Sequence, residues 1–142
     1  MKVTLNRMNQ AVHFRASSKE GYTVNIDGGE TSDGADQGVR PMQLVLMAAG
    51  GCSSIDIHLL LKKMRQPIED LKIEVEAERV DEIPAVFKKI FFHYHFKGDL
   101  KEEKVRKSIE MSLDKHCSVV KMLDHKVEIG YDFSINGQLF KK

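Results

Sequence analysis

The sequence predicts an α+β protein, and three observations support this fold class. Short alternating segments occupy the first 26 residues, two long segments have helical character, and further alternating segments lie between and after them. Alternation of apolar and polar residues is typical of a half-buried strand, whereas apolar residues three and four apart are typical of a helix. The predicted order is β-β-β-α-β-β-α-β, and we expect the 142 residues to form one domain, residues 1–142.

The N-terminal part predicts an antiparallel meander of three strands. Asn9-Gln10 and Glu20-Gly21 supply the turn signals between β-rich segments. The predicted strands span residues 2–7, 12–16 and 22–26. A polar, glycine-rich loop is expected to follow over residues 28–38.

The first predicted helix is the most apolar segment of the chain. Pro41 suits the first helical turn because its missing N–H would have no partner there. From residue 42 to about residue 65 almost every face is apolar, and Pro67 ends the segment. A helix that is apolar nearly all round is expected to be buried on all sides.

The second half of the chain predicts three strands and an amphipathic helix. Spacings of three and four favour one continuous helix over residues 101–123, and the recurring residues are Val105, Ile109, Leu113, His116, Val120 and Leu123. The predicted strands span residues 71–79, 90–96 and 127–133.

Charge and composition exclude several classes of protein. The net charge of +1 gives no electrostatic support for a nucleic-acid partner. The N-terminus lacks the apolar core of a signal peptide. The apolar run from Leu44 ends at Ala49 and is soon followed by Asp56 and His58, so no membrane span or membrane partner is expected. We therefore expect a cytoplasmic protein.

The two cysteines are the candidate chemical groups. Cys52 lies near the middle of the first predicted helix and Cys117 late in the second, with Asp56 one helical turn after Cys52 and His116 beside Cys117. In a reducing compartment a permanent structural disulfide is not expected, whereas a transient catalytic disulfide can form. Two interpretations stay open from the residues alone, because a free cysteine also serves as a small buried hydrophobic residue.

Two glycines directly before Cys52 need a reason. Glycine costs a helix interior about 1 kcal/mol relative to alanine. Gly50 and Gly51 would let a neighbouring backbone or a substrate approach the thiol closely.

Two segments around the cysteines resemble the OsmC/Ohr family, the osmotically induced and organic hydroperoxide resistance proteins. They are PMQLVLMAAGGCSSID at residues 41–56 and KHCSVVKML at residues 115–123. The order of elements and the strand at residues 87–98 that leads into the second helix agree with this resemblance. The resemblance implies an OsmC-like fold, with two central helices wrapped by antiparallel sheets in an intertwined homodimer whose sites lie at the subunit interface.

The resemblance also implies a chemistry. Cys52 would be the peroxidatic thiol that reduces an organic hydroperoxide and becomes a sulfenic acid, and Cys117 the resolving thiol that condenses with it to a disulfide. A small or protein-bound dithiol would reduce that disulfide. No cofactor and no metal ion are implied.

The chain departs from the family's peroxidases at one position. These enzymes carry a glutamate directly after the helix-opening proline, where it orients an arginine onto the thiolate, and this chain has Met42 there. Arg7 is the first candidate for that arginine, with Arg15 and Arg40 as alternatives. Because a methionine cannot hold a guanidinium group, we expect slower peroxide reduction. The alternative function is a non-peroxidase OsmC-like dimer that binds a small molecule.

A metal site is a further alternative. His93 and His95 share one face of a predicted strand, and His58, His116 and Cys117 could add ligands. The sequence has neither CxxC nor HExxH spacing. A solvated or interface-forming strand face is the simpler interpretation, so no metal site is predicted.

Overall fold

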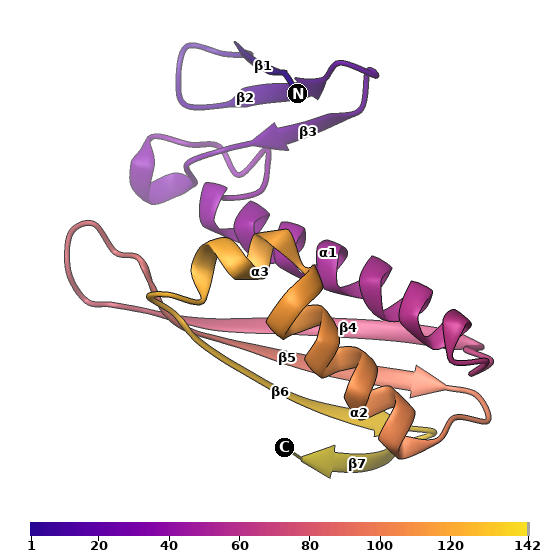
Figure 1. The fold of residues 1–142 in the computed structure, drawn as a ribbon. Helices are drawn as coiled ribbons and strands as arrows, with labels where there is room; N and C mark the ends of the chain where they lie inside the picture. Colours follow the sequence, from indigo (N-terminus) through magenta and orange to yellow (C-terminus); the bar gives the residue numbers. More distant parts are fainter. Residues whose placement is uncertain (142) are drawn as a thin grey trace. The chain divides into compact units, whose positions relative to one another are not determined.

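A computed structural model describes residues 1–141 (Figure 1). It divides into two compact units, Met1–Val45 and the chain from Leu46 onward. The predicted α+β class and the predicted order of elements are confirmed, with one additional strand and a break in the second helix. The single domain over residues 1–142 stays a prediction.

The first unit contains the predicted meander. Strands β1 (Val3–Arg7), β2 (Phe14–Ser18) and β3 (Thr23–Ile26) form an antiparallel sheet in the order β1-β2-β3. The second strand begins two residues later than predicted. The loop that follows contains a short 3₁₀ turn, η1 (Glu30–Ser32).

A buried carboxylate holds this loop together. Asp27 accepts hydrogen bonds from the backbone N–H groups of Gly29 at 2.8 Å and Gln37 at 3.2 Å. These hydrogen bonds, the Gly29 one above all, hold the pKa of Asp27 below its ordinary value. Helix α1 (Pro41–Lys63) then begins, and the Gln43 side chain accepts a hydrogen bond from the backbone N–H of Arg40 at 2.9 Å. A residue near the start of a helix that reaches back in this way satisfies a donor the helix leaves unpaired.

The second unit is built on a four-stranded sheet in the order β4-β5-β6-β7. Strands β4 and β5 are antiparallel, β5 and β6 parallel, and β6 and β7 antiparallel. The sheet is therefore mixed, and the implied antiparallel sheet is wrong at one pair, because the helical segment between β5 and β6 carries the chain back across the sheet. The strands are β4 (Asp70–Arg79), β5 (Phe87–Lys97), β6 (Glu128–Ile135) and β7 (Gln138–Lys141).

Helices α1 and α2 cover one face of this sheet (Figure 1). The aromatic residues Phe92, Tyr94 and Phe96 of β5 point to the covered face and are at most 1% exposed. Ile57 of α1 and Ile109 of α2 are fully buried. The period-two alternation predicted for β5 is confirmed, with the histidines on the opposite face.

The second helix is not continuous, and the prediction of one helix over residues 101–123 is wrong after Met111. The chain forms α2 (Glu102–Met111), a π turn, η2 (Ser112–His116), and α3 (Ser118–Leu123). The backbone N–H of Cys117 bonds to the carbonyl of Ser112, five residues earlier, at 2.8 Å. Cys117 itself is extended, with φ −70° and ψ 98°, so a new helix starts after it. Such π turns inside helical segments are frequent at functional sites.

A C-terminal hairpin was not predicted. Asn136 and Gly137 have φ values of 50° and 88° and turn the chain from β6 into β7. An Asn-Gly pair suits a two-residue hairpin turn because both residues tolerate positive φ. Asn136 also pairs its side-chain amide with both backbone groups of Gly98, in the turn that follows β5.

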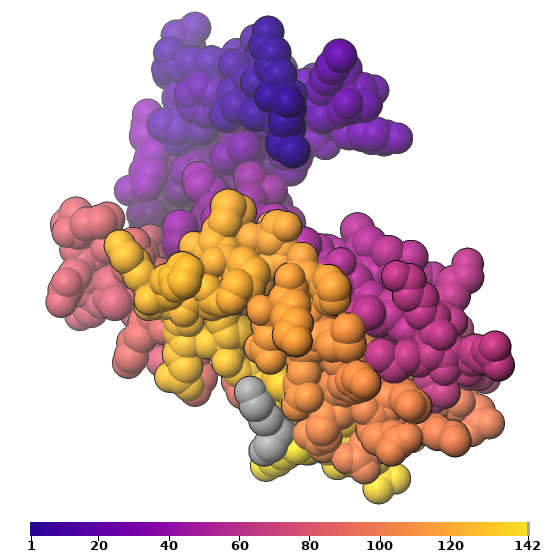
Figure 2. All heavy atoms as spheres, in the orientation of Figure 1, coloured from indigo at the N-terminus to yellow at the C-terminus, as the bar shows by residue number. Residues whose placement is uncertain are grey.

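Helix α1 is only partly buried by its own chain, and its burial on all sides in a dimer stays a prediction. Met47, Ile55 and Leu59 are 56%, 63% and 50% exposed. Figure 2 shows atoms of α1 (magenta) and of α2 and α3 (orange) at the surface. By length and mean hydropathy, 1.7 over 18 residues, α1 could also cross a membrane, but a helix that packs on the core of a soluble protein meets the same criteria.

Candidate functional site

The structure brings the two cysteines together where α1 meets the break in the second helical segment. Cys52 lies on α1, and Cys117 lies at the break between η2 and α3. Their Sγ atoms and a carboxylate oxygen of Asp56 all lie within 4.8 Å of one another. Two cysteines that are 65 positions apart in the sequence therefore lie in one site, as the sequence predicted. Both thiols are free.

The two thiols differ in exposure. Cys117 is fully buried and its Sγ lies 3.9 Å from the carbonyl oxygen of Ala49, whereas Cys52 is partly exposed. Burial, with a smaller contribution from the adjacent Cys52, raises the pKa of the Cys117 thiol to about 11. The nearby backbone N–H of Val120 acts in the opposite direction. A reagent from solution therefore meets Cys52 first, and Cys117 is a protonated thiol at neutral pH.

Hydroxyl groups link the cysteine cluster to the core. The buried Ser112 hydroxyl lies 3.3 Å from a carboxylate oxygen of Asp56 and 3.4 Å from the carbonyl oxygen of Ser53, and it can donate to either. Tyr94 of β5 donates to the Ser53 hydroxyl at 3.1 Å. Burial raises the pKa of Tyr94 well above its ordinary value, so it stays a neutral donor.

The sequence pointed to Asp56 but not to the three hydroxyl groups. Asp56 was placed by its spacing of one helical turn from Cys52. Ser53, Ser112 and Tyr94 carry no motif, and their roles depend on helix-to-sheet packing that local periodicity does not encode. The predicted neighbour His116 is exposed and lies outside the cluster.

The two glycines before Cys52 have different surroundings. A Cβ atom at Gly50 would lie 3.2 Å from a methyl group of Val75, so Gly50 allows α1 to lie close to β4. A Cβ atom at Gly51 would meet nothing within 4 Å in its own chain. Gly50 therefore serves packing of helix on sheet, and neither glycine faces a backbone that approaches the thiol within the described residues.

The three candidate arginines all lie in the first unit, each with its own partners. Arg7 donates to the backbone carbonyls of Ala11 and Gln10, which closes the turn between β1 and β2. Arg15 donates to Asn25, and Arg40 pairs with Asp36 at 2.6 Å. An arginine beside Cys52, with Arg7 as first candidate, stays a prediction.

The cysteine cluster has the donor atoms of a metal site. Two thiolates and a carboxylate could serve as three ligands of a zinc ion. His93 and His95, the possible ligands named from the sequence, do not join this cluster. His93 binds Asp132 at 2.8 Å and His95 binds Glu74 at 3.0 Å, on the sheet face away from the helices.

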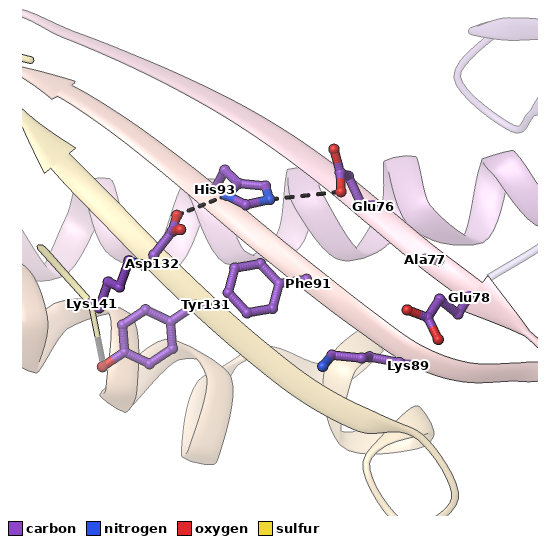
Figure 3. Close-up of a pocket in the computed structure, with 9 residues that line it drawn as sticks. All are labelled: Glu76, Ala77, Glu78, Lys89, Phe91, His93, Tyr131, Asp132 and Lys141. Carbon is purple, nitrogen blue, oxygen red and sulfur yellow. Dashed lines mark hydrogen bonds and ion pairs between the residues drawn. The ribbon is translucent and has the colours of Figure 1, made fainter. Parts of the chain in front are cut away.

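That outer sheet face carries a shallow groove of about 570 Å³ (Figure 3). His93 lies between Asp132 and Glu76, and the Phe91 ring lies over Gly130, where a Cβ atom would approach the ring to 2.7 Å. Its lining includes acidic side chains of β4 and β6 and the basic side chains of Lys89 and Lys141. The groove contains neither cysteine, so the two-thiol cluster remains the candidate active site.

Three comparisons with known proteins agree. The family model described as OsmC-like protein matches residues 34–132. Protein YhfA of Escherichia coli strain K12 is 35% identical over 127 residues, which cover 89% of this chain and 92% of YhfA.

Solved structures share the fold. The crystal structure of a hypothetical protein from Aquifex aeolicus superposes with a TM-score of 0.80 at 26% identity, covering 95% of this chain and 96% of that one. An organic hydroperoxide resistance protein OsmC from Legionella pneumophila superposes with a TM-score of 0.72 at 14% identity, covering 94% and 97%. At that low identity the second similarity shows the fold alone.

Proposed function

Because this chain belongs to the OsmC-like protein family, we propose that it reduces organic hydroperoxides through Cys52 and Cys117. One observation carries the proposal. A partly exposed thiol and a fully buried one lie within 4.8 Å of each other on separate helical segments. This arrangement lets an oxidant reach one sulfur and places the second sulfur close enough to form a disulfide with the oxidised one.

The chemistry assigns a different role to each thiol. The Cys52 thiolate attacks the peroxide oxygen, the O–O bond breaks, and an alcohol leaves while Cys52 becomes a sulfenic acid. Cys117 then displaces the sulfenic hydroxyl as water and forms the Cys52–Cys117 disulfide. A small or protein-bound dithiol restores both thiols by exchange.

We propose that the working protein is a homodimer. The exposed apolar residues Met47, Ile55 and Leu59 follow each other at intervals of eight and four residues and therefore share one face of α1. Gly51 lies on the same face with open space above it. A second copy is the partner that the family resemblance implies for this face.

Thiol counting tests the peroxidase proposal. Cumene hydroperoxide added in slight excess is expected to lower the free thiols rapidly from two to zero per chain, with no intermolecular disulfide on non-reducing gels. Cys52→Ser is expected to lose rapid peroxide consumption, whereas Cys117→Ser keeps it for one turnover and accumulates a sulfenic acid that dimedone labels. Oxidation of the wild-type protein no faster than that of a free thiol would contradict the proposal and favour a binding role.

A further inference from the structure

The carboxylate in the cysteine cluster has no part in the chemistry described so far. Asp56 lies one turn after Cys52 on α1, and its carboxylate oxygen lies within 4.8 Å of both sulfur atoms. Aspartate is one of the residue types that serve as general acids and bases in enzymes.

The position of Asp56 is fixed from both helical segments. Its backbone belongs to the same helix as Cys52, and its carboxylate lies 3.3 Å from the hydroxyl of Ser112. Ser112 in turn accepts the backbone N–H of Cys117 through its carbonyl group, at 2.8 Å. The π turn therefore holds both Ser112, which contacts the carboxylate, and the buried Cys117 in fixed positions.

We propose that Asp56 carries the proton of the resolving step, a role that rests on the peroxidase function proposed above. As the Cys117 sulfur attacks the sulfur of the Cys52 sulfenic acid, its proton passes to the Asp56 carboxylate. The new S–S bond forms, the S–O bond breaks, and the departing hydroxide takes the same proton from Asp56 and leaves as water. The sulfenic sulfur is reduced and the thiol sulfur oxidised, each to the level of a disulfide, so no other reactant is needed.

The buried thiol needs such a base. Cys117 is fully buried, away from water that could take up its proton, and the thiolate rather than the thiol is the reactive form. Among the described residues, the titratable groups clustered with Asp56 are Cys52 on its own helix and Cys117, and Tyr94 lies further along, bonded to the Ser53 hydroxyl. Tyr94 is protonated and donates to Ser53, so it does not replace the carboxylate.

A disulfide-exchange assay isolates this step from peroxide chemistry. The more exposed Cys52 is expected to react with Ellman's reagent first and to release one thionitrobenzoate per chain. Cys117 then attacks the mixed disulfide and releases a second thionitrobenzoate, at a rate independent of reagent concentration. Because thionitrobenzoate leaves without a proton, the second phase requires the proton of Cys117 to be removed but no proton to be delivered to a leaving group.

Asp56→Asn is expected to slow the second phase by about 100-fold, the usual range for loss of a general base, and to change the first phase far less. In this variant the second-phase rate is expected to rise about tenfold per pH unit from neutral pH upward, because only thiolate already formed can react. The wild-type rate should depend less on pH. Asp56→Glu is expected to recover part of the rate, and Asp114→Asn, an exposed neighbour in the π turn, should match the wild type.

An Asp56→Asn second phase with wild-type rate and pH dependence would overturn the role of Asp56. Release of only one thionitrobenzoate by the wild-type chain would overturn both this role and the two-cysteine function. A slowed second phase in a protein that cumene hydroperoxide does not oxidise would support Asp56 as the base for Cys117 and overturn only the peroxidase proposal.

Discussion

At the scale of single residues, burial of Cys117 couples its proton to folding. The pKa of the thiol is about 11 in the folded chain, against an ordinary value of 9.0. The folded protein therefore holds this proton more tightly than the unfolded protein does. The resulting contribution to stability is complete below pH 9.0 and is lost as the pH rises through about 11.

Replacement of this thiol makes the effect measurable. Cys117→Ala is expected to be less stable than the wild type at neutral pH, because it leaves a small cavity. Between pH 9.0 and about 11 the free energy of unfolding should fall by up to about 2–3 kcal/mol more in the wild type than in the variant. Urea unfolding with a non-thiol reductant at several pH values measures this difference. A gap between the two proteins that stays constant with pH would show that Cys117 titrates alike in both states.

Single residues were also where the sequence was most informative about the site. Cys52, Asp56 and Cys117 could be selected because their side chains carry chemistry and because the helical period places the first two on one face. Ser112 could not be selected. A serine in an amphipathic segment gives no sign of whether it faces solvent or a carboxylate on another helix.

At the scale of elements, the two turns at one end of the sheet are joined through one side chain. Asn136 accepts a hydrogen bond from the Gly98 N–H at 3.1 Å and donates one to the Gly98 carbonyl at 2.9 Å. These bonds connect the turn between β5 and α2 with the hairpin between β6 and β7. Asn136 also tolerates the φ of 50° that the hairpin requires.

Two substitutions separate these contributions. Asn136→Gly keeps the positive φ and loses the two side-chain hydrogen bonds, at an expected cost of about 1–2 kcal/mol. Asn136→Ala loses the bonds and adds the strain of a left-handed conformation, at an expected total of about 2–3 kcal/mol. Urea unfolding at neutral pH checks both values. If Asn136→Gly is as stable as the wild type, the link between the two turns contributes nothing.

The elements themselves were predicted unevenly. The long, strongly patterned elements α1, β4 and β5 follow directly from their periodicity. The helix break at Cys117 does not, because the apolar spacing of three and four continues through it and the π turn is stabilised by packing against α1. Hairpin strand β7 was missed although Asn136-Gly137 is a known turn signal, since only four residues pair beyond it.

At the scale of the whole molecule, α1 has more apolar side chains than its own chain buries. Its packed face meets the sheet through fully buried residues such as Ala49, Ile57 and Leu61. Its opposite face presents Met47, Ile55 and Leu59, with a glycine in the same stripe. Periodicity alone predicted a helix buried on all sides and could not say which neighbour buries each side. The homodimer proposed above would account for both the exposed apolar residues and the open space above Gly51.

A charged residue in the exposed apolar face of α1 tests the proposed homodimer. The wild-type protein is expected to sediment as a dimer at micromolar concentration, and its melting temperature should rise with protein concentration because dissociation is linked to unfolding. Ile55→Glu places a carboxylate in the covered face, and an unpaired buried charge costs several kcal/mol, so the dissociation constant should rise by about 100-fold or more. Ile83→Glu is the matched control, because Ile83 is 101% exposed in the loop between β4 and β5.

The Ile83→Glu control should leave the dimer intact. A wild-type protein that is monomeric and stable, or an Ile55→Glu variant that dimerises as tightly as the control, would mean that α1 keeps its apolar face in water and that no second copy covers it.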